Sequence, residues 1–383
     1  MSARFTRMCC NIVNRVEPGA WTISRDMQLT HKNGALINLQ NAQILYKTSS
    51  FWSRKKILTQ FLEALGTQSA IQEEPFESYL DAIRPCVRNA FLLDTLRAHV
   101  EEADFVYRKL SDSLIEILMV DREKTMQSLS KKTLEQAGIP PKEAFKMAHL
   151  NLERATQGSW NQLAEGLFQS NCGDDYDSSR VLLEDYMDQV PVTGQRVVFI
   201  PDRNTLIVAD SAIPNALERA FEIVDSLQLV GPITMIPFVF EGGVRPWDPN
   251  PGLRLRYLRR VYSEMVALYS DQQDLHQLEE SDTHYASYDV MENEGGEMCA
   301  FTALTKGMSA HLPRADVVVL IDPNHSKETS ALATVTWASF SAVMSHQLKK
   351  TSSYPPRYEA HRFPSHPEIK RMQPFQSQEG KKT

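Results

Sequence analysis

The sequence predicts an α+β protein of two modules, each a mainly antiparallel sheet packed with helices, followed by a basic tail. The most apolar and β-branched run of the chain is VVFIPDRNTLIVAD at residues 197–210, where the Pro-Asp-Arg-Asn turn separates two strand-forming runs. A second stretch, HLPRADVVVLID at residues 311–322, also has a proline nine positions before a closing Asp. We therefore expect two strand–turn–strand ribbons, each central to its own module.

Length and composition place the chain among ordinary globular proteins. Its 383 residues, 42% hydrophobic and 23% charged, are enough for two or three domains with buried cores. No apolar run approaches the roughly 18 residues that span a bilayer, and the N-terminus lacks the apolar core of a secretory signal. We expect a cytoplasmic protein without a membrane partner. The five cysteines form no C-x-x-C pair, so neither a disulfide framework, a zinc site nor another cofactor is expected.

Charge is unevenly distributed along the chain. The net charge is −7, but residues 349–383 contain eight Lys or Arg and three Asp or Glu, a local charge of +5. The preceding 348 residues therefore carry −12. An acidic body repels nucleic-acid phosphates, so we expect a protein partner, with nucleic acid reachable only through the basic tail.

The first module is predicted to cover residues 1–231. We expect a hairpin over residues 21–39 with its turn at Asn33-Gly34, and a buried strand over residues 113–120. Helical periodicity predicts helices over residues 125–137, 140–155 and 178–188, and another that begins at Pro214. His149 lies on the apolar face of one of these helices and is expected to be a core residue.

Six segments of this module resemble the YtpQ-like family of bacterial proteins. They are NLQNAQILY (38–46), IRP (83–85), SLIEILMVDRE (113–123), GIPPKEAFKMAHLNL (138–152), DDYDSSRVLLED (174–185) and GQRVVFIPDRNTLIV (194–208). The resemblance covers roughly residues 30–230, and its motifs are structural. It implies an α+β cytosolic protein and transfers no catalytic residue to this chain.

The second module is predicted to cover residues 232–348. It begins with a strand over residues 233–240, continues with a long helix over residues 253–277, and includes strands near residues 285–290, 298–304 and 317–321. Residues 349–383 are rich in proline and basic residues, which predicts a tail without a core of its own. An extended tail docked on the second module is the alternative.

One candidate site is the acidic loop with Asp174, Asp175 and Asp177. Carboxylate oxygens are the ligands that Mg²⁺ and Ca²⁺ prefer, so the loop could bind a hard cation. The spacing is not that of an EF-hand, however. The alternative, which we favour, is that Asp177 caps the following helix and the other two favour its positive end.

Arginines supply the other candidate sites. Arg203 and Arg314 follow the prolines of the two ribbons, where a guanidinium could clamp a carboxylate or phosphate, or could pair within the chain with Asp202 or Asp316. Four more crowd the first turns of the long helix, where the helix dipole disfavours positive charge. They could bind an anion or partner, or contact the acidic body: Arg254, Arg256, Arg259 and Arg260.

Two functions remain open from the sequence. The chain lacks the G-x-S-x-G, Walker A, G-x-G-x-x-G and H-E-x-x-H motifs, which favours a non-enzymatic binding or adaptor protein that recognises a macromolecular partner. The alternative is a metal-assisted hydrolase of a phosphorylated or acidic substrate. It would use the 174–185 carboxylates for the metal and Arg203 or Arg314 as anion clamps.

Overall fold

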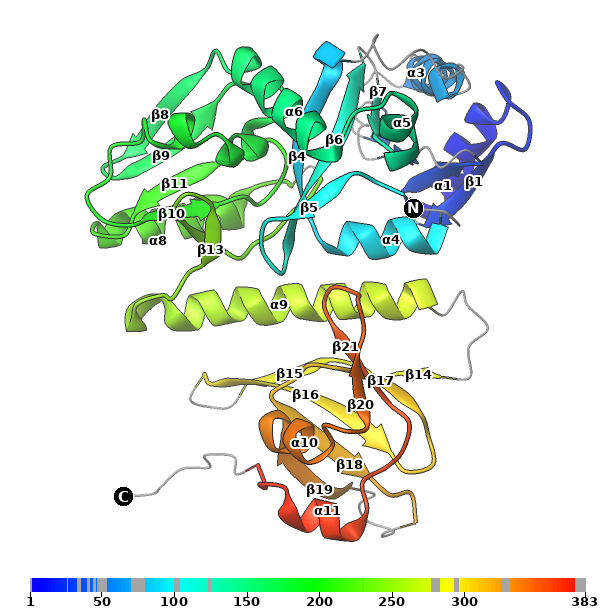
Figure 1. Ribbon diagram of the computed structural model, residues 1–383, viewed down its shortest axis with the longest axis vertical. Coiled ribbons are helices and arrows are strands. Elements are labelled where there is room, and N and C mark those ends of the chain that lie inside the picture. The colour runs from blue at the N-terminus through cyan, green and yellow to red at the C-terminus, as the bar shows by residue number, and fades with distance from the viewer. Residues whose placement is uncertain are drawn as a thin grey trace. The chain divides into compact units, whose positions relative to one another are not determined.

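The computed structural model describes residues 2–25, 27–32, 36–39, 42–43, 46, 54–69, 80–99, 104–122, 125–229, 231–276, 283–292, 296–324 and 331–375. Within these ranges, helices pack against five mostly antiparallel sheets, which confirms the predicted α+β class (Figure 1). The chain forms two compact units. Unit 1 comprises Met1–Leu92 and Leu96–Trp247, and unit 2 comprises Leu93–Thr95 and Asp248–Thr383. None of the helices described is both long enough and apolar enough to cross a membrane.

Unit 1 begins with a small three-stranded sheet and two helices. The elements are α1 (Ser2–Val13), β1 (Trp21–Arg25), β2 (Gln28–His31), β3 (Leu36–Asn38) and α3 (Arg54–Ser69). β1 pairs antiparallel with β2, with Arg25 opposite Gln28, and Met27 has a positive φ of 62°. The hairpin expected over residues 21–39 is therefore wrong in its first half, where two paired strands stand in place of one. The expected Asn33-Gly34 turn lies outside the described residues.

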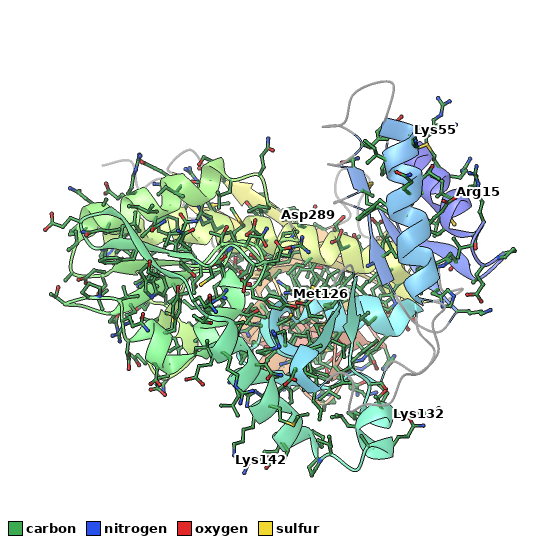
Figure 2. The ribbon with its side chains drawn as sticks, turned by 90° about the horizontal axis from the view of Figure 1, so that it is seen from above. Arg15, Lys55, Met126, Lys132, Lys142 and Asp289 are labelled. Atoms are coloured by element: carbon green, nitrogen blue, oxygen red, sulfur yellow. The ribbon has the colours of Figure 1, made fainter. Side chains whose placement is uncertain are left out.

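The second sheet of unit 1 is built around the predicted apolar strand. Its strands are β4 (Ile83–Asn89), β5 (Tyr107–Lys109), β6 (Leu114–Arg122) and β7 (Thr125–Ser128), and its helices are α4 (Phe91–His99), α5 (Lys131–Gln136) and α6 (Pro141–Ala155). The helix expected over residues 125–137 is thus a strand followed by a shorter helix. α5 and α6 are amphipathic: Leu134 and Ala148 are buried, whereas Lys132 and Lys142 point into solvent (Figure 2).

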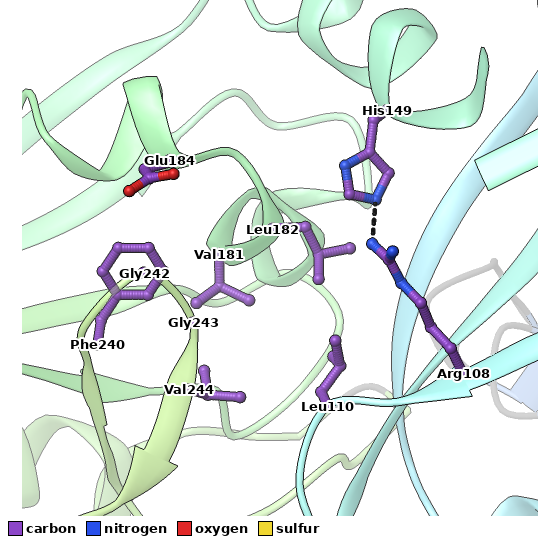
Figure 3. A pocket seen from close by; sticks show the side chains of 10 residues that line it. All are labelled: Arg108, Leu110, His149, Val181, Leu182, Glu184, Phe240, Gly242, Gly243 and Val244. Atoms are coloured by element: carbon purple, nitrogen blue, oxygen red, sulfur yellow. Dashed lines mark hydrogen bonds between the residues drawn. The ribbon is translucent and has the colours of Figure 1, made fainter. Parts of the chain in front are cut away.

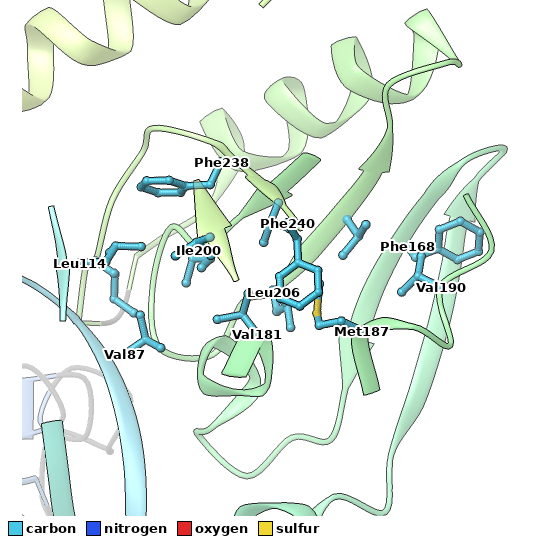
Figure 4. Packing of buried hydrophobic residues seen from close by; sticks show 14 residues of the cluster. Val87, Leu114, Phe168, Val181, Met187, Val190, Ile200, Leu206, Phe238 and Phe240 are labelled. Atoms are coloured by element: carbon cyan, nitrogen blue, oxygen red, sulfur yellow. The ribbon is translucent and has the colours of Figure 1, made fainter. Parts of the chain in front are cut away.

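A six-stranded antiparallel sheet completes unit 1. Its order is β13 (Val244–Pro246), β12 (Phe238–Phe240), β10 (Arg196–Phe199), β11 (Ile207–Asp210), β9 (Leu167–Asn171) and β8 (Ser159–Ala164). The 3₁₀-helix η2 (Asp177–Leu182) and the helices α7 (Glu184–Met187) and α8 (Pro214–Ser226) pack with it. β10 and β11 are the predicted ribbon at residues 197–210, now confirmed as a central hairpin. Side chains from this sheet share one apolar core with Val87 and Leu114 of the second sheet (Figure 4).

The predicted module boundary at residue 231 is wrong. β12 pairs with β10, from Arg196 opposite Phe240 to Val198 opposite Phe238. Residues 238–246 therefore extend the sheet of unit 1, and the boundary between the compact units falls after Trp247.

Unit 2 contains the long helix α9 (Pro251–His276) and two four-stranded sheets. One sheet has the order β14 (His284–Tyr285), β17 (Ala310–Pro313), β21 (Arg357–Ala360) and β20 (Leu348–Lys350). The other has the order β15 (Asp289–Glu292), β16 (Met298–Thr305), β18 (Val317–Ile321) and β19 (Ala331–Thr336). The helices α10 (Trp337–Val343) and α11 (His366–Arg371) complete it. The second predicted ribbon is wrong, because β17 and β18 belong to different sheets.

The basic tail predicted over residues 349–383 is also wrong over its described part. β21 lies between β17 and β20, and Ala360 and Met372 belong to the apolar core of unit 2. Arg357 is 1% exposed. The positive charge of Arg357 is therefore buried within unit 2.

Candidate functional site

The acidic loop of unit 1 is engaged within the chain. Both carboxylate oxygens of Asp174 accept hydrogen bonds from Arg180, at 2.8 and 2.7 Å. Asp177 accepts one from the Ser170 hydroxyl at 2.6 Å and others from two backbone N–H groups. Asp177 therefore closes the loop that precedes η2 and does not cap a helix as predicted. No group of three or more His, Cys, Asp or Glu among the described residues is placed to hold a metal ion.

Arg203 and Arg314 lie in different units. The Arg203 guanidinium is 3.8 Å from the carboxylate of Asp175, so it forms an ion pair with the acidic loop. Arg314 is exposed, and its backbone N–H donates to Tyr269. Asp316, the partner suggested for Arg314, accepts instead from Tyr262 and from the backbone N–H of Ala300.

Two of the four arginines at the start of α9 form ion pairs within unit 2. Arg254 lies 3.8 Å from Asp248, and Arg259 lies 2.6 Å from Glu292 on β15. Arg260 is buried and Arg256 half-buried. Ion pairs within unit 2 thus offset the positive charge of Arg254 and Arg259 at the N-terminal end of the helix.

The structure places a pocket of about 150 Å³ in unit 1, whose lining includes Glu184 of the 174–185 carboxylates but none of the predicted aspartates or arginines (Figure 3). Four segments meet there: the end of β5, the middle of α6, the junction of η2 and α7, and the turn between β12 and β13. Its lining is largely apolar, with polar groups at Arg108, His149 and Glu184. The apolar side chains are Leu110, Val181, Leu182, Phe240 and Val244.

A buried carboxylate organises the cationic side of this pocket. Glu116, on β6, has a fully buried side chain. One of its oxygens is 2.5 Å from Nε of Arg108, and the other is 2.7 Å from Nε2 of His149. Burial of a carboxylate is tolerated only when it is paired and hydrogen-bonded, and these two contacts supply that pairing. The prediction of His149 as a core residue is wrong, because its side chain is 26% exposed and lines the pocket.

The contact between Arg108 and His149 cannot be a good hydrogen bond while Glu116 is ionised. Nε2 of His149 lies 3.1 Å from Nη2 of Arg108, the contact drawn in Figure 3, and also 2.7 Å from Glu116. An ionised carboxylate only accepts and a guanidinium only donates. Nε2 must therefore carry the proton that bonds Glu116, which leaves Nη2 of Arg108 without an acceptor there.

The opposite side of the pocket presents an unpaired carboxylate. Glu184 is exposed, and its side chain has no partner among the described residues. Gly242 and Gly243 lie beside it, and a Cβ on Gly242 would be 3.9 Å from Oε1 of Glu184. Both glycines have positive φ, 62° and 149°, so the tight turn keeps this side free of further side chains. The pocket thus offers an N–H donor, an acceptor and an apolar floor.

The sequence contained one signal for this pocket. In LIEILMV, the run of β6, Glu116 interrupts an otherwise apolar strand. A carboxylate in such a strand requires cationic partners. Arg108 lies on the neighbouring β5 and faces Glu116 in the strand register, so it could have been proposed. His149 and the 240–244 turn come from distant segments that carry no shared motif.

Comparisons with models of protein families, with curated proteins and with solved structures find no match to this chain. The resemblance of residues 30–230 to the YtpQ-like family therefore stays a prediction.

Proposed function

We propose that this chain is a non-enzymatic binding protein that recognises a protein partner, and that the pocket of unit 1 receives part of that partner. The observation that supports this is the makeup of the pocket: an apolar floor between an arginine with uncommitted N–H groups and an unpaired carboxylate. Apolar concave sites with a few polar groups that fix orientation are typical of binding sites.

The residues that line the pocket favour binding over hydrolysis. The lining includes no Ser, Thr or Cys that could act as a nucleophile beside His149. Of the 174–185 carboxylates of the hydrolase alternative, Glu184 alone lines the pocket, and Asp174 and Asp177 are held by Arg180, Ser170 and backbone amides. A metal would have to displace these bonds.

A photocrosslinking amino acid in place of Leu110 tests the proposal. Leu110 lines the pocket, so we expect it to crosslink a partner in a lysate of the source cells. Excess unlabelled wild-type protein should abolish the crosslink, whereas unlabelled Leu110→Asp, with a charge on the apolar floor, should compete poorly.

Leu163→Asp is the matched control competitor. Leu163 is 42% exposed on β8 and does not line the pocket, so this variant should compete like the wild type. Equal competition by Leu110→Asp and the wild type would refute a role for the pocket in partner binding.

A further inference from the structure

We propose that the group received by the pocket is the C-terminal residue of a protein chain, with an apolar side chain. This inference rests on the proposed function and names the chemistry that the partner presents. A C-terminal residue carries three groups in a compact space: a carboxylate, a side chain and one backbone N–H. The pocket contains a complement to each of them.

Arg108 is the complement of the carboxylate. Its Nε is fixed by the buried Glu116, which orients the guanidinium, while its Nη2 has no acceptor among the described residues because His149 donates to Glu116. The side chain is 49% exposed, so the Nη edge is accessible. Guanidinium groups bind carboxylates through two parallel N–H···O bonds, which uses that edge fully. The guanidinium also lies 4.8 Å above the ring of Phe145, a contact that restrains its plane.

The apolar floor is the complement of the side chain. Five aliphatic or aromatic side chains surround a volume of about 150 Å³, which is the size of one side chain rather than of a nucleotide cofactor. A terminal Leu, Ile or Phe would exchange water for these contacts, and burial of such a side chain is strongly favourable.

Glu184 is the complement of the N–H group. Its carboxylate is unpaired and exposed, and it lies across the floor from Arg108 (Figure 3). Because both polar residues reach solvent, the preceding part of a partner chain could leave the pocket without crossing buried backbone. A free amino acid carries the same three groups, so the experiment must separate the two sources.

Fluorescence anisotropy with the full-length protein can test this. The probe is fluorescein-labelled Gly-Ser-Ala-Leu with a free C-terminal carboxylate, compared with the same peptide ending in an amide. We expect the acid to bind roughly tenfold more tightly, because charge-assisted hydrogen bonds contribute more than neutral ones. Unlabelled free leucine should compete much less well than the unlabelled acid peptide.

Two variants assign the preference to residues. Arg108→Lys retains a charge near Glu116 but loses the two-pronged geometry, so the acid peptide should lose most of its advantage over the amide. Glu184→Gln lies at an exposed position and should weaken both peptides by a similar factor. Unchanged melting temperatures would show that both variants are folded.

Three results would overturn the inference: equal affinity for the acid and amide peptides, no binding of either, or free leucine competing as well as the peptide. These results are separable from failure of the proposed function. If the crosslink at Leu110 still shows competition that Leu110→Asp lacks, a partner uses the pocket through some other group.

Discussion

Among the residues that the structure describes, each unit contains one arginine that is at most 1% exposed, and the two are stabilised in opposite ways. Arg180 of unit 1 has no exposed surface and binds both oxygens of Asp174. Burial disfavours its charge, but the bonds to Asp174 outweigh this and raise its pKa above the ordinary value. Arg357 of unit 2 is 1% exposed and has no carboxylate partner within the described part of the chain.

Arg357 is held by neutral groups instead. Its guanidinium donates to the side-chain oxygen of Gln272 and to the backbone carbonyls of Ala286, His311 and Tyr269, at 2.8–3.0 Å. It also lies 5.0 Å from the ring of Tyr269. Because burial is not offset by an anion, its pKa falls to about 10. Arg357 is thus stabilised by hydrogen bonds without a counter-ion. Through these bonds it connects helix α9, the loop after β14 and strands β17 and β21.

The largest effect that tests this comparison is expected from Arg357→Ala. It would remove the guanidinium donor from three backbone carbonyls and an amide oxygen and create a cavity, so the free energy of unfolding of unit 2 should fall by about 4 kcal/mol. Hydrogen exchange measured on peptides from residues 248–375 would report the loss. Arg371→Ala, at an exposed position on α11, should change it by less than about 0.5 kcal/mol. Similar exchange for both variants would refute the role given to Arg357.

A smaller effect is expected in unit 1 from Asp174→Asn. The substitution keeps the shape of the side chain but leaves the charge of Arg180 buried without its main partner, at a cost of about 3 kcal/mol. Urea denaturation would measure it. The control is Asp175→Asn, because Asp175 is 55% exposed and 3.8 Å from Arg203, and exposed ion pairs contribute at most about 1 kcal/mol. Equal costs would mean that burial of Arg180 does not matter.

The smallest expected effect is a difference in stability between the two units in mildly acidic solution. Burial lowers the pKa of His311 below its ordinary value of 6.5, and nearby His276, Arg357 and His361 add to this, while Glu359 opposes it. The unfolded chain therefore takes up the proton more readily, and the contribution of neutral His311 is lost as the pH falls below about 6.5. Unit 2 should lose protection from hydrogen exchange between pH 7 and pH 5, and His311→Gln should reduce this dependence.

Unit 1 should behave differently over the same pH range. Burial raises the pKa of Asp174 and of Asp210, but their hydrogen bonds reverse this and place both below the ordinary value of 3.8. Their contribution is present at higher pH and is lost only as the pH falls below about 4. Equal loss of protection in both units above pH 5 would contradict this difference.

The two ribbons show what could be predicted from sequence. The runs at residues 197–210 and 311–322 are both strand–turn–strand by composition, and all four strands form. Only β10 and β11 pair with each other, from Arg196 opposite Asp210 to Phe199 opposite Ile207. β17 pairs with β14 and β21, and β18 pairs with β16 and β19. Local sequence determines that a strand forms, whereas its partners depend on packing with distant segments.

Most of the candidate pocket was beyond prediction for a similar reason. Glu184 and the 240–244 turn join Arg108 and His149 only when the second and six-stranded sheets of unit 1 pack together. The tail was mispredicted because proline and charge were interpreted as lack of a core. The structure instead buries Arg357 and Ala360 of β21, and the half-buried Tyr358 packs against the apolar core of unit 2.

The position of β21 has a consequence for how unit 2 acquires its structure. It lies between β17 and β20, yet β18, β19 and α10 separate it from β17 along the chain. The sheet that contains β21 therefore closes a long loop, and such non-local pairing slows folding. We expect the sheet of β15, β16, β18 and β19 to form first. Until β21 pairs with β17, the edge of β17 stays exposed, so unit 2 is prone to aggregation at that stage.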